Sequence, residues 1–386
     1  MDPRPTAPPA RDKLLFTPGP LTTSASVKQA MLHDAGSWHF EFNARVKWIR
    51  QQLLHVAGLA EADGPSPGSE QRYEAILLQG SGTFGVEAVF ATCIPPQGKV
   101  AVLANGAYGE RMVTMLQMAR IAHVVWRVPE AQALNPEALD RALVEDPSVT
   151  HVAVVHCETT TGLLNPIAEL GAVTRRHGRG YIVDAMSSFG AIPIDLPGWG
   201  IDYLISSANK CIEGVPGFSF VLARRAALLA CEGFARSLSL DLLGQLKGFE
   251  KNGQFRYTPP THALLAFGRA LEELHAEGGV SARAQRYARN HQVLVEGMRR
   301  LGFPPYLDPQ IQSYIITSFH YPKSPRFSFD VFYRKLSDQG YIIYPGKISQ
   351  VDLFRIGSVG RLFEPDFHAL LAAIAQTLDE MGVALP

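Results

Sequence analysis

Between about residues 74 and 222, short apolar runs alternate with longer amphipathic segments. Segments 108–120 and 167–177 place their apolar residues at helical spacing. The short runs have the length and the β-branched content of buried strands; they are EAILL, KVAVLA, HVVWRV, HVAVVH, YIVDA, YLISS and FSFVLA. Strands that alternate with helices form mostly parallel sheets covered on both faces, so the sequence predicts an α/β fold with a mostly parallel, seven-stranded sheet.

The last third of the chain follows a different pattern. Residues 262–302 have helical spacing, and Gly278-Gly279 marks the end of one helix. Strand-like SYIITSFHY, GYIIYPG and FRIGS follow, together with helical segments near 329–339 and 364–381. A chain of 386 residues is longer than one hydrophobic core usually covers. We therefore expect a disordered proline-rich leader (1–13), a large domain (14–280) and a smaller α+β domain (281–386).

Composition and charge narrow the classes of partner. Lysine plus arginine equals aspartate plus glutamate at 36 each, so the formal net charge is zero. Without a basic excess we expect no nucleic-acid partner, and without an apolar stretch of about 18 residues we expect no membrane segment. The N-terminus lacks the apolar core of a signal peptide, and the four cysteines are widely spaced. We therefore expect a reducing cytoplasm as the location and no metal site.

An acid and a lysine follow two of the predicted strands. Asp184 ends YIVD, and Lys210 follows YLISSAN, ahead of a glycine-containing turn over 213–217. Both fall on the edge of the sheet where ligands bind, beyond the carboxyl ends of the strands. A lysine there can bind pyridoxal 5′-phosphate (PLP) covalently, and a carboxylate can keep the PLP ring nitrogen protonated so that the ring accepts electrons. Taken alone, Asp184 could instead be a helix cap and Lys210 a solvated loop residue.

Three further strand ends carry residues suited to such a cofactor. In LLQGSGTF, the N–H groups of Gly82 and Thr83 and the hydroxyl of Ser81 precede a helix whose dipole favours a phosphate. A tight turn without a ligand is the alternative. Tyr108, after KVAVLAN, could stack on a flat cofactor or be a surface tyrosine in a turn. Thr159, after HVAVVHCE, could hydrogen-bond the phenolic oxygen of PLP or cap a helix.

The order of these segments resembles that of the class-V aminotransferases, which are fold-type-I PLP enzymes. The resemblance covers nearly all of the chain after residue 13 and is most specific over residues 201–218. It implies a large PLP-binding domain and a smaller C-terminal domain. The segments that carry it are TPGPLTTS, LLQGSGTF, NGAYGER, HCETTTGLLNPI, YIVDAMSSFG, IDYLISSANKCIEGVPGF, ARSLSLDL, YTPPTH, YPGKISQ and FRIGSVG.

The resemblance also implies a role for each candidate residue. Lys210 corresponds to the lysine that binds PLP and later moves a proton, and Asp184 to the partner of the ring nitrogen. Thr258 corresponds to a threonine that reaches the phosphate site of the other subunit, which implies a homodimer with shared active sites. The residues expected to bind the cofactor are therefore Ser81, Gly82, Thr83, Tyr108, Thr159, Asp184, Ser207, Lys210 and Thr258.

Arg355 corresponds to the residue that binds the acidic end of the substrate. A guanidinium group suits a carboxylate or a phosphonate because it can donate two parallel hydrogen bonds. A salt-bridged residue on an edge strand is the competing interpretation of Arg355. The backbone at Gly19 and the hydroxyls of Thr22 and Thr23 could add donors to the substrate site.

Segments that are not needed to hold PLP, such as ARSLSLDL and YPGKISQ, resemble one branch of the family. That branch uses an aminophosphonate, so we expect 2-aminoethylphosphonate as amino donor and pyruvate as acceptor, in phosphonate catabolism. Residues 37–43, SWHFEFN, depart from the acidic segment of that branch. Trp38, His39 and Glu41 could therefore change the donor, or the difference could be harmless at the start of a surface helix.

Other activities remain as alternatives. An alanine–glyoxylate or serine–pyruvate type aminotransferase, or a transaminase of a related aminophosphonate, would use the same chemistry. A desulfurase-like lyase would need a mobile cysteine in the last third of the chain, and no cysteine follows Cys231. A non-enzymatic binding protein would be expected to have lost Lys210. Cys211, beside that lysine, is expected to be a small buried residue.

Overall fold

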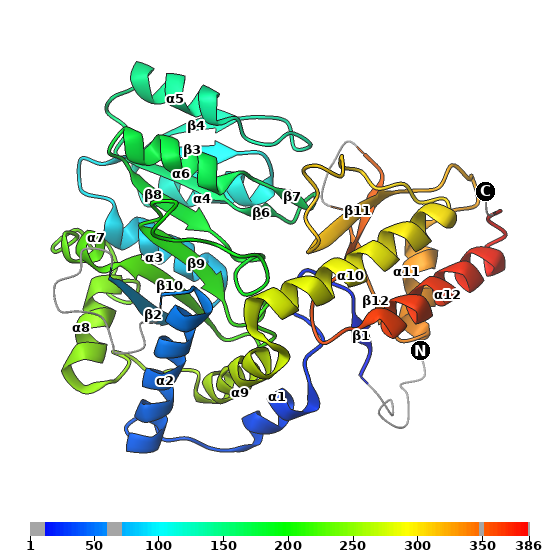
Figure 1. The fold of residues 1–386 in the computed structure, drawn as a ribbon, viewed down its shortest axis with the longest axis horizontal. Helices are drawn as coiled ribbons and strands as arrows, with labels where there is room; N and C mark the ends of the chain where they lie inside the picture. Colours follow the sequence, from blue (N-terminus) through cyan, green and yellow to red (C-terminus); the bar gives the residue numbers. More distant parts are fainter. Residues whose placement is uncertain (1–11, 60–71, 347–350, 385–386) are drawn as a thin grey trace.

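A seven-stranded mixed sheet forms the centre of the larger part of the molecule (Figure 1). The computed structural model describes residues 12–59, 72–346 and 351–384. Along the sheet the strand order is β2-β10-β9-β8-β5-β3-β4, and β10 runs antiparallel to both of its neighbours while the remaining pairs are parallel. The strands are β2 (Tyr73–Gln79), β3 (Lys99–Ala104), β4 (Ala122–Arg127), β5 (His151–Val155), β8 (Gly180–Asp184), β9 (Tyr203–Ser207) and β10 (Phe218–Arg224).

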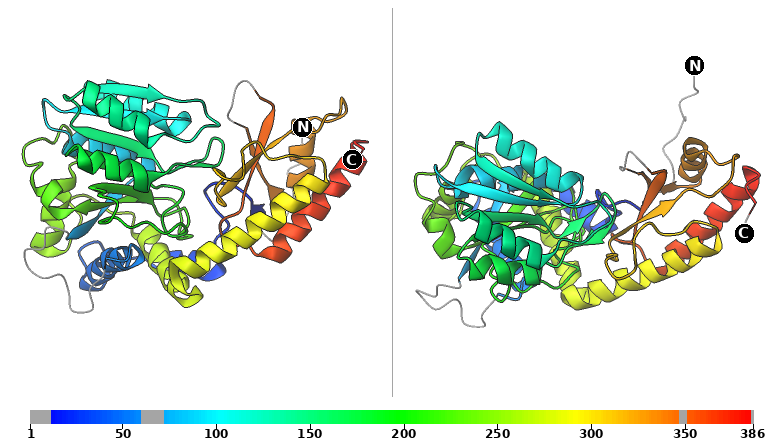
Figure 2. Two further views of the ribbon diagram at one scale, coloured as in Figure 1. Left: turned by 45° about the horizontal axis from the view of Figure 1, so that its top comes forward. Right: turned by 90° about the horizontal axis from the view of Figure 1, so that it is seen from above.

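These strands confirm the seven that the apolar runs predict. The central strands β8 and β9 are buried along almost their whole length, which is why their sequences are continuous apolar runs rather than alternating ones. Helices α3 and α4 cover one face of the sheet and α6 covers the other (Figures 1 and 2). The helices of this part are α1 (Ala25–Gln29), α2 (Phe40–Val56), α3 (Gly82–Cys93), α4 (Ala107–Met118), α5 (Pro136–Glu145), α6 (Ile167–Arg176), α7 (Arg225–Leu229), α8 (Leu242–Asn252) and α9 (Thr261–Glu277), with a 3₁₀ turn over Ala30–Leu32.

A smaller α+β part follows in the chain. Its three-stranded antiparallel sheet has the order β11-β14-β13, with β11 at Ile316–His320, β13 at Tyr344–Pro345 and β14 at Leu353–Gly357. It packs with α10 (Gly279–Arg300), α11 (Phe329–Asp338) and α12 (Glu364–Glu380) around a separate apolar cluster that includes Phe303, Phe319 and Phe354. The long helix α10 runs from the larger part into the smaller one (Figures 1 and 2).

The segment GYIIYPG forms two short strands where the sequence indicated one. Tyr341–Ile342 (β12) pairs in parallel with Leu14–Leu15 (β1), whereas β13 pairs with β14. The chain divides at Ile343, whose side chain is fully buried in the apolar cluster of the smaller part. A pairing with residues more than 300 positions away leaves no local sequence signal.

Some expectations fall on residues that the structure does not describe. Residues 1–11 of the predicted leader, 60–71 of the polar loop and 347–350 of YPGKISQ lie outside the described residues. The domain boundary at residue 280 stays a prediction, because α10 begins there but contacts both parts. In the described part of the chain, no helix is long and apolar enough to cross a membrane.

Candidate active site

A cavity of about 180 Å³ lies at the carboxyl ends of the parallel strands, where ligands of such sheets bind. Residues from five separate strand ends meet there, which the chain brings together only by folding. Of the residues expected to bind the cofactor, all but Thr258 line it: Ser81, Gly82, Thr83, Tyr108, Thr159, Asp184, Ser207 and Lys210.

Lys210 follows β9 and is covered by the N-terminal arm of the chain. Its Nζ donates a hydrogen bond to the Pro18 carbonyl at 2.9 Å. A Cβ atom at Gly19 would lie 2.9 Å from the same Nζ, and Gly19 has φ +121°, so glycine is required for this close approach. Burial lowers the pKa of Lys210 and so favours the neutral amine, which is the nucleophilic form. Lys210 is therefore not the solvated loop residue of the alternative interpretation.

Asp184 ends β8 and is buried, with 6% of its surface exposed. Its Oδ1 accepts a hydrogen bond from the Met186 N–H at 2.9 Å. Burial raises the pKa of Asp184 to about 6, although this hydrogen bond and the charges of Lys210 and Arg111 oppose the rise. The residues after Asp184 form turns rather than a helix, so the helix-cap interpretation is wrong.

The segment 81–83 forms the first turn of α3. Ser81 is the N-cap residue of α3, and its side chain makes no capping hydrogen bond. First-turn N–H groups have no acceptor within their own helix, so they remain available to an anion in the cavity. A Cβ atom at Gly82 would lie 2.1 Å from Met186 Sδ, which explains the glycine. The Ser207 hydroxyl, on the opposite wall, donates to Asn209 Oδ1 at 3.2 Å.

Tyr108 and the turn that contains Thr159 are joined by Glu158, a residue to which the sequence assigns no role. Glu158 is fully buried, and its Oε2 accepts the Tyr108 N–H at 3.2 Å while its Oε1 accepts the Thr160 N–H, also at 3.2 Å. The carboxylate therefore caps α4 from a distant strand. A Cβ atom at Gly106, the N-cap position, would lie 2.3 Å from Glu158 Cγ. That glycine, where a polar cap is usual, is the only sequence signal we recognise for this contact.

Arg111 is a second residue that sequence reasoning missed. It lies one turn after Tyr108 on α4, with its guanidinium 4.8 Å from the centre of the tyrosine ring. Its Nη1 also donates to Thr83 Oγ1 at 3.4 Å. The spacing of three residues on a helix could have indicated this pair. Tyr108 is thus part of a helix and not a surface tyrosine in a turn, and Thr159 lies in a turn between two short strands rather than at a helix cap.

Arg355 contacts the site from the smaller part of the molecule through Thr159, although it is not itself among the residues that line the cavity. It is buried on β14, and its Nη1 donates to the Thr159 carbonyl at 2.8 Å and its Nε to the Pro345 carbonyl at 2.9 Å. Within the described ranges no carboxylate forms an ion pair with it. Because β14 is the middle strand of its sheet, the interpretation of Arg355 as a salt-bridged edge-strand residue is wrong.

Several other candidates lie apart from this cavity. Thr258 is exposed, and its carbonyl accepts a hydrogen bond from Gln79 Nε2 at 3.0 Å. Thr22 uses its hydroxyl to accept the Leu15 N–H at 2.7 Å. Cys211 is buried as expected, and its thiol donates to the Ser187 carbonyl at 3.3 Å. Trp38, His39 and Glu41 stand at the start of α2, where His39 and Glu41 line a different cavity.

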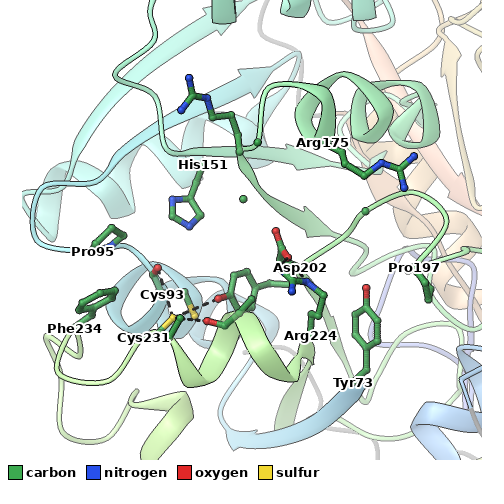
Figure 3. Close-up of a pocket in the computed structure, with 17 residues that line it drawn as sticks. Tyr73, Cys93, Pro95, His151, Arg175, Pro197, Asp202, Arg224, Cys231 and Phe234 are labelled. Carbon is green, nitrogen blue, oxygen red and sulfur yellow. Dashed lines mark hydrogen bonds and ion pairs between the residues drawn. The ribbon is translucent and has the colours of Figure 1, made fainter. Parts of the chain in front are cut away.

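A further cavity lies at the opposite edge of the sheet, at the amino ends of the parallel strands (Figure 3). Among the residues that line it are Cys93, His151, Asp202, Arg224 and Cys231. Arg224 forms an ion pair with Asp202 at 2.6 Å, so this aspartate is already neutralised. The lining contains none of the predicted site residues, and the candidate active site is therefore the cavity at the carboxyl ends.

Comparisons with known proteins agree with this geometry. The profile of the family described as "Aminotransferase class-V" matches residues 68–328. The 2-aminoethylphosphonate–pyruvate transaminase of Klebsiella pneumoniae is 54% identical over 367 residues, which cover 95% of this chain and 97% of the relative. The protein of the same name from Salmonella typhimurium is 52% identical with the same coverage.

Solved structures share the fold. The pyridoxamine–pyruvate aminotransferase of Mesorhizobium loti superposes with a TM-score of 0.86 at 22% identity, covering 98% of this chain and 95% of that chain. The alanine–glyoxylate aminotransferase of Nostoc sp. superposes with a TM-score of 0.85 at 24% identity, covering 98% of both chains. These likenesses confirm the predicted fold class.

Proposed function

Since this chain belongs to the class-V aminotransferase family, we propose that it transfers the amino group of 2-aminoethylphosphonate to pyruvate, with PLP as cofactor. The products are phosphonoacetaldehyde and L-alanine, and the setting is phosphonate catabolism. Two kinds of observation support the proposal: relatives with that activity in their names match almost the full length of the chain, and the cavity gathers the residues that a PLP site needs.

The residues present fit PLP at both of its ends. The uncapped first turn of α3, with Ser81, Gly82 and Thr83, offers N–H and hydroxyl donors to the phosphate. Asp184 offers a buried carboxylate to the ring nitrogen. In our proposal, Ser207 adds a phosphate contact, Tyr108 stacks on the ring, and Thr159 hydrogen-bonds its phenolic oxygen.

Lys210 and Asp184 supply the proton chemistry. When bound, PLP supplies an electron sink that lowers the barrier to removing a proton from the carbon that bears the amino group. Lys210 would hold the cofactor and would move that proton, first as a general base and then as a general acid. Burial suits its amine to this role, because it lowers the pKa toward the working pH. Asp184 keeps the ring nitrogen protonated by its negative charge.

The environment of Arg355 is the single observation that carries the assignment of an acidic substrate. A buried guanidinium without a carboxylate partner in the described structure is costly, yet Arg355 lies against Thr159 at the wall of the cavity. A substrate carboxylate or phosphonate would pair with it and offset that cost. The backbone at Gly19 lies close enough to Lys210 to contribute to the same substrate site. Both substrates, 2-aminoethylphosphonate and pyruvate, carry the acidic group that Arg355 would bind.

In our proposal the working form is a cytoplasmic homodimer. Leu32, Trp38 and Phe40 are 80%, 78% and 73% exposed in the single chain, and exposed apolar groups of this size usually mark a contact surface. Thr258, exposed and held through its carbonyl by Gln79, would donate to the phosphate site of the other subunit. Residues 37–43 would then lie at a subunit contact, where they could influence the amino donor.

The identity of the donor is tested by the first half-reaction. The purified PLP-loaded protein is mixed with 2-aminoethylphosphonate, alanine or serine, and the loss of the absorbance of lysine-bound PLP is followed. We expect the highest second-order rate constant with 2-aminoethylphosphonate, and a fall of at least about 100-fold in Arg355→Lys, which lacks the two-pronged geometry. A faster reaction with alanine or serine, also lost in Arg355→Lys, would contradict the phosphonate assignment and support a general amino-acid transaminase.

A further inference from the structure

Glu213 stands three positions after Lys210 in an unusual backbone conformation. Its φ is +65°, and its side chain is buried with 3% exposed. Residues with a Cβ atom rarely adopt this conformation, and where they do the surrounding structure enforces it, often at functional sites. The Glu213 N–H donates to the Lys210 carbonyl at 2.7 Å. The position of Glu213 is therefore tied directly to that of the lysine.

The Glu213 side chain binds the start of α10. Its Oε1 accepts hydrogen bonds from the Tyr287 hydroxyl at 2.6 Å and from Arg286 Nη2 at 2.7 Å. Arg283, one turn earlier and fully buried, donates from Nη1 to the Cys211 carbonyl at 2.6 Å. Cys211 and Glu213, one and three positions after Lys210, are thus held by side chains of one helix.

The same side chains of α10 hold the segment that follows β14. Arg286 Nη1 donates to the carbonyls of Gly360 at 2.7 Å and Leu362 at 3.0 Å. The Tyr287 hydroxyl, while donating to Glu213, accepts the Gly360 N–H at 3.1 Å. Gly360 lies five positions after Arg355. Glu213, Arg286 and Tyr287 therefore connect the lysine loop to the chain segment that carries the substrate arginine.

Glu213, Glu277, Arg283 and Arg286 form a junction between the two parts of the molecule. Its charges are balanced, and its side chains are largely buried. Arg283 and Arg286 face Glu213 and Glu277, with ion-pair distances of 2.7 to 2.8 Å for the closest contacts. Side-chain exposures lie between 0% and 16%. Removing one carboxylate would leave a buried guanidinium unpaired, which is far more costly than losing a surface ion pair. The junction should therefore behave as a rigid unit.

We propose that Glu213 is a positioning residue, which fixes Lys210 relative to Arg355 through Tyr287 and Arg286. This role of Glu213 rests on the proposed function in one respect, namely that Lys210 and Arg355 act on the same substrate. Lys210 comes from the larger part of the molecule and Arg355 from the smaller, so their separation is set by contacts between the two parts, among them this junction and the hydrogen bond from Arg355 to the Thr159 carbonyl. Misplacement of reacting groups by about 1 Å can slow a reaction about 100-fold.

Three substitutions at Glu213 distinguish the effect of its carboxylate from the effect of its positive φ. Glu213→Gly removes the carboxylate but suits the positive φ, whereas Glu213→Ala removes the carboxylate and keeps the strain. Glu213→Gln retains Oε1 as an acceptor, because Oε2 makes no hydrogen bond among the described residues. We expect the rate constant of the half-reaction to fall at least tenfold in the Gly and Ala variants and less than about threefold in Gln. Wild-type rates in Glu213→Gly would overturn the proposal.

Tyr287→Phe provides a test that does not depend on Glu213 variants folding. It removes only the hydroxyl that joins Glu213 to Gly360. Tyr73→Phe is the matched control, because the hydroxyl of that buried tyrosine donates to the Ile201 carbonyl at 2.6 Å, away from the site. Both variants should lose a similar amount of thermal stability. Only Tyr287→Phe should raise KM for the amine and speed hydrogen–deuterium exchange in peptides 208–216 and 353–362 of the PLP-loaded protein.

Hydrogen–deuterium exchange requires no substrate, and KM is measured with whichever amine reacts fastest. The test therefore remains valid even if the amino donor is not 2-aminoethylphosphonate. Faster exchange in both peptides with a raised KM in Tyr287→Phe supports the proposal. Unchanged exchange in either peptide, or the same rise of KM in Tyr73→Phe, overturns it.

Discussion

Burial sets the chemistry of Asp184 before any ligand binds. Its pKa of about 6 in the folded protein exceeds its usual value of 3.8, so ionising this carboxylate opposes folding. The energetic cost of ionising Asp184 is absent below about pH 4, grows as the pH rises between the two pKa values, and is complete above about pH 6. A cofactor with a protonated ring nitrogen would offset it.

This makes Asp184→Asn a variant with opposite effects on stability and activity. At pH 7.5 the cofactor-free variant should be more stable than wild type by up to about 3 kcal/mol, with the gain vanishing near pH 4. Its activity should fall at least about 100-fold. Denaturant unfolding of the cofactor-free proteins across this pH range measures the first effect. Asp202→Asn is the control, because that buried aspartate pairs with Arg224 and its loss should destabilise.

A cofactor-free Asp184→Asn protein that is less stable than wild type at pH 7.5 would contradict the account. So would a difference that does not change with pH, because the gain is assigned to the ionisation of one group.

The sequence is sufficient to identify site residues whose position is determined by the strand directly before them. Asp184 and Lys210 were recognisable because each follows a buried strand whose direction fixes its location. Glu158 was not, since its carboxylate acts on the Tyr108 N–H, about 50 residues earlier in the chain. Arg355 required the family resemblance, because nothing near β14 in sequence indicates that it faces Thr159.

The helix α3 depends on a small residue in its first turn. Its first turn packs against Met186, and a Cβ atom at Gly82 would lie 2.1 Å from Met186 Sδ and 2.3 Å from its Cε. The contact couples the phosphate-binding turn to the turn that follows Asp184. The strands and helices themselves follow from apolar periodicity, whereas the pairing of β1 with β12 does not, because it joins residues near the two ends of the chain.

Gly82→Ala should therefore weaken PLP binding without unfolding the protein. Either the Met186 side chain, which lines the same cavity, moves and crowds the cofactor, or α3 shifts and displaces the N–H donors, so we expect Kd for PLP to rise at least tenfold. Equilibrium titration monitored by absorbance checks this. Gly248→Ala in α8 is the control, since its nearest contact is Arg256 Cγ at 3.2 Å, and it should bind PLP normally. Unchanged affinity in Gly82→Ala would argue against the phosphate site at α3.

For the whole molecule, the claim of shared active sites is open to a mixing experiment. Lys210→Ala and Thr258→Ala should each be inactive or severely impaired as homodimers. In a heterodimer both changes fall in one site, so the other is intact, and random mixing in equal amounts should restore about a quarter of wild-type activity. No recovery after verified subunit exchange, with Thr258→Ala impaired alone, would contradict a shared site.

The division of the molecule into two parts was predictable because the two parts of the sequence show different patterns. The alternating segment up to about residue 222 gave the sheet, and the helical stretch after residue 262 marked a change. The junction at α10 was not predictable, because Arg283 and Arg286 look like ordinary charged helix residues. Both face Glu213, which is distant in the chain, and Arg286 also donates to carbonyls of the smaller part.

The proposed function requires that the cavity at the carboxyl ends of the strands holds PLP on Lys210. Borohydride reduction of the purified holoprotein, followed by peptide mass mapping, tests it most directly, because reduction makes the lysine–PLP bond permanent. The account predicts a pyridoxyl group on the peptide that contains Lys210 and no label in Lys210→Ala. Label on another lysine, such as Lys347 outside the described residues, would contradict it.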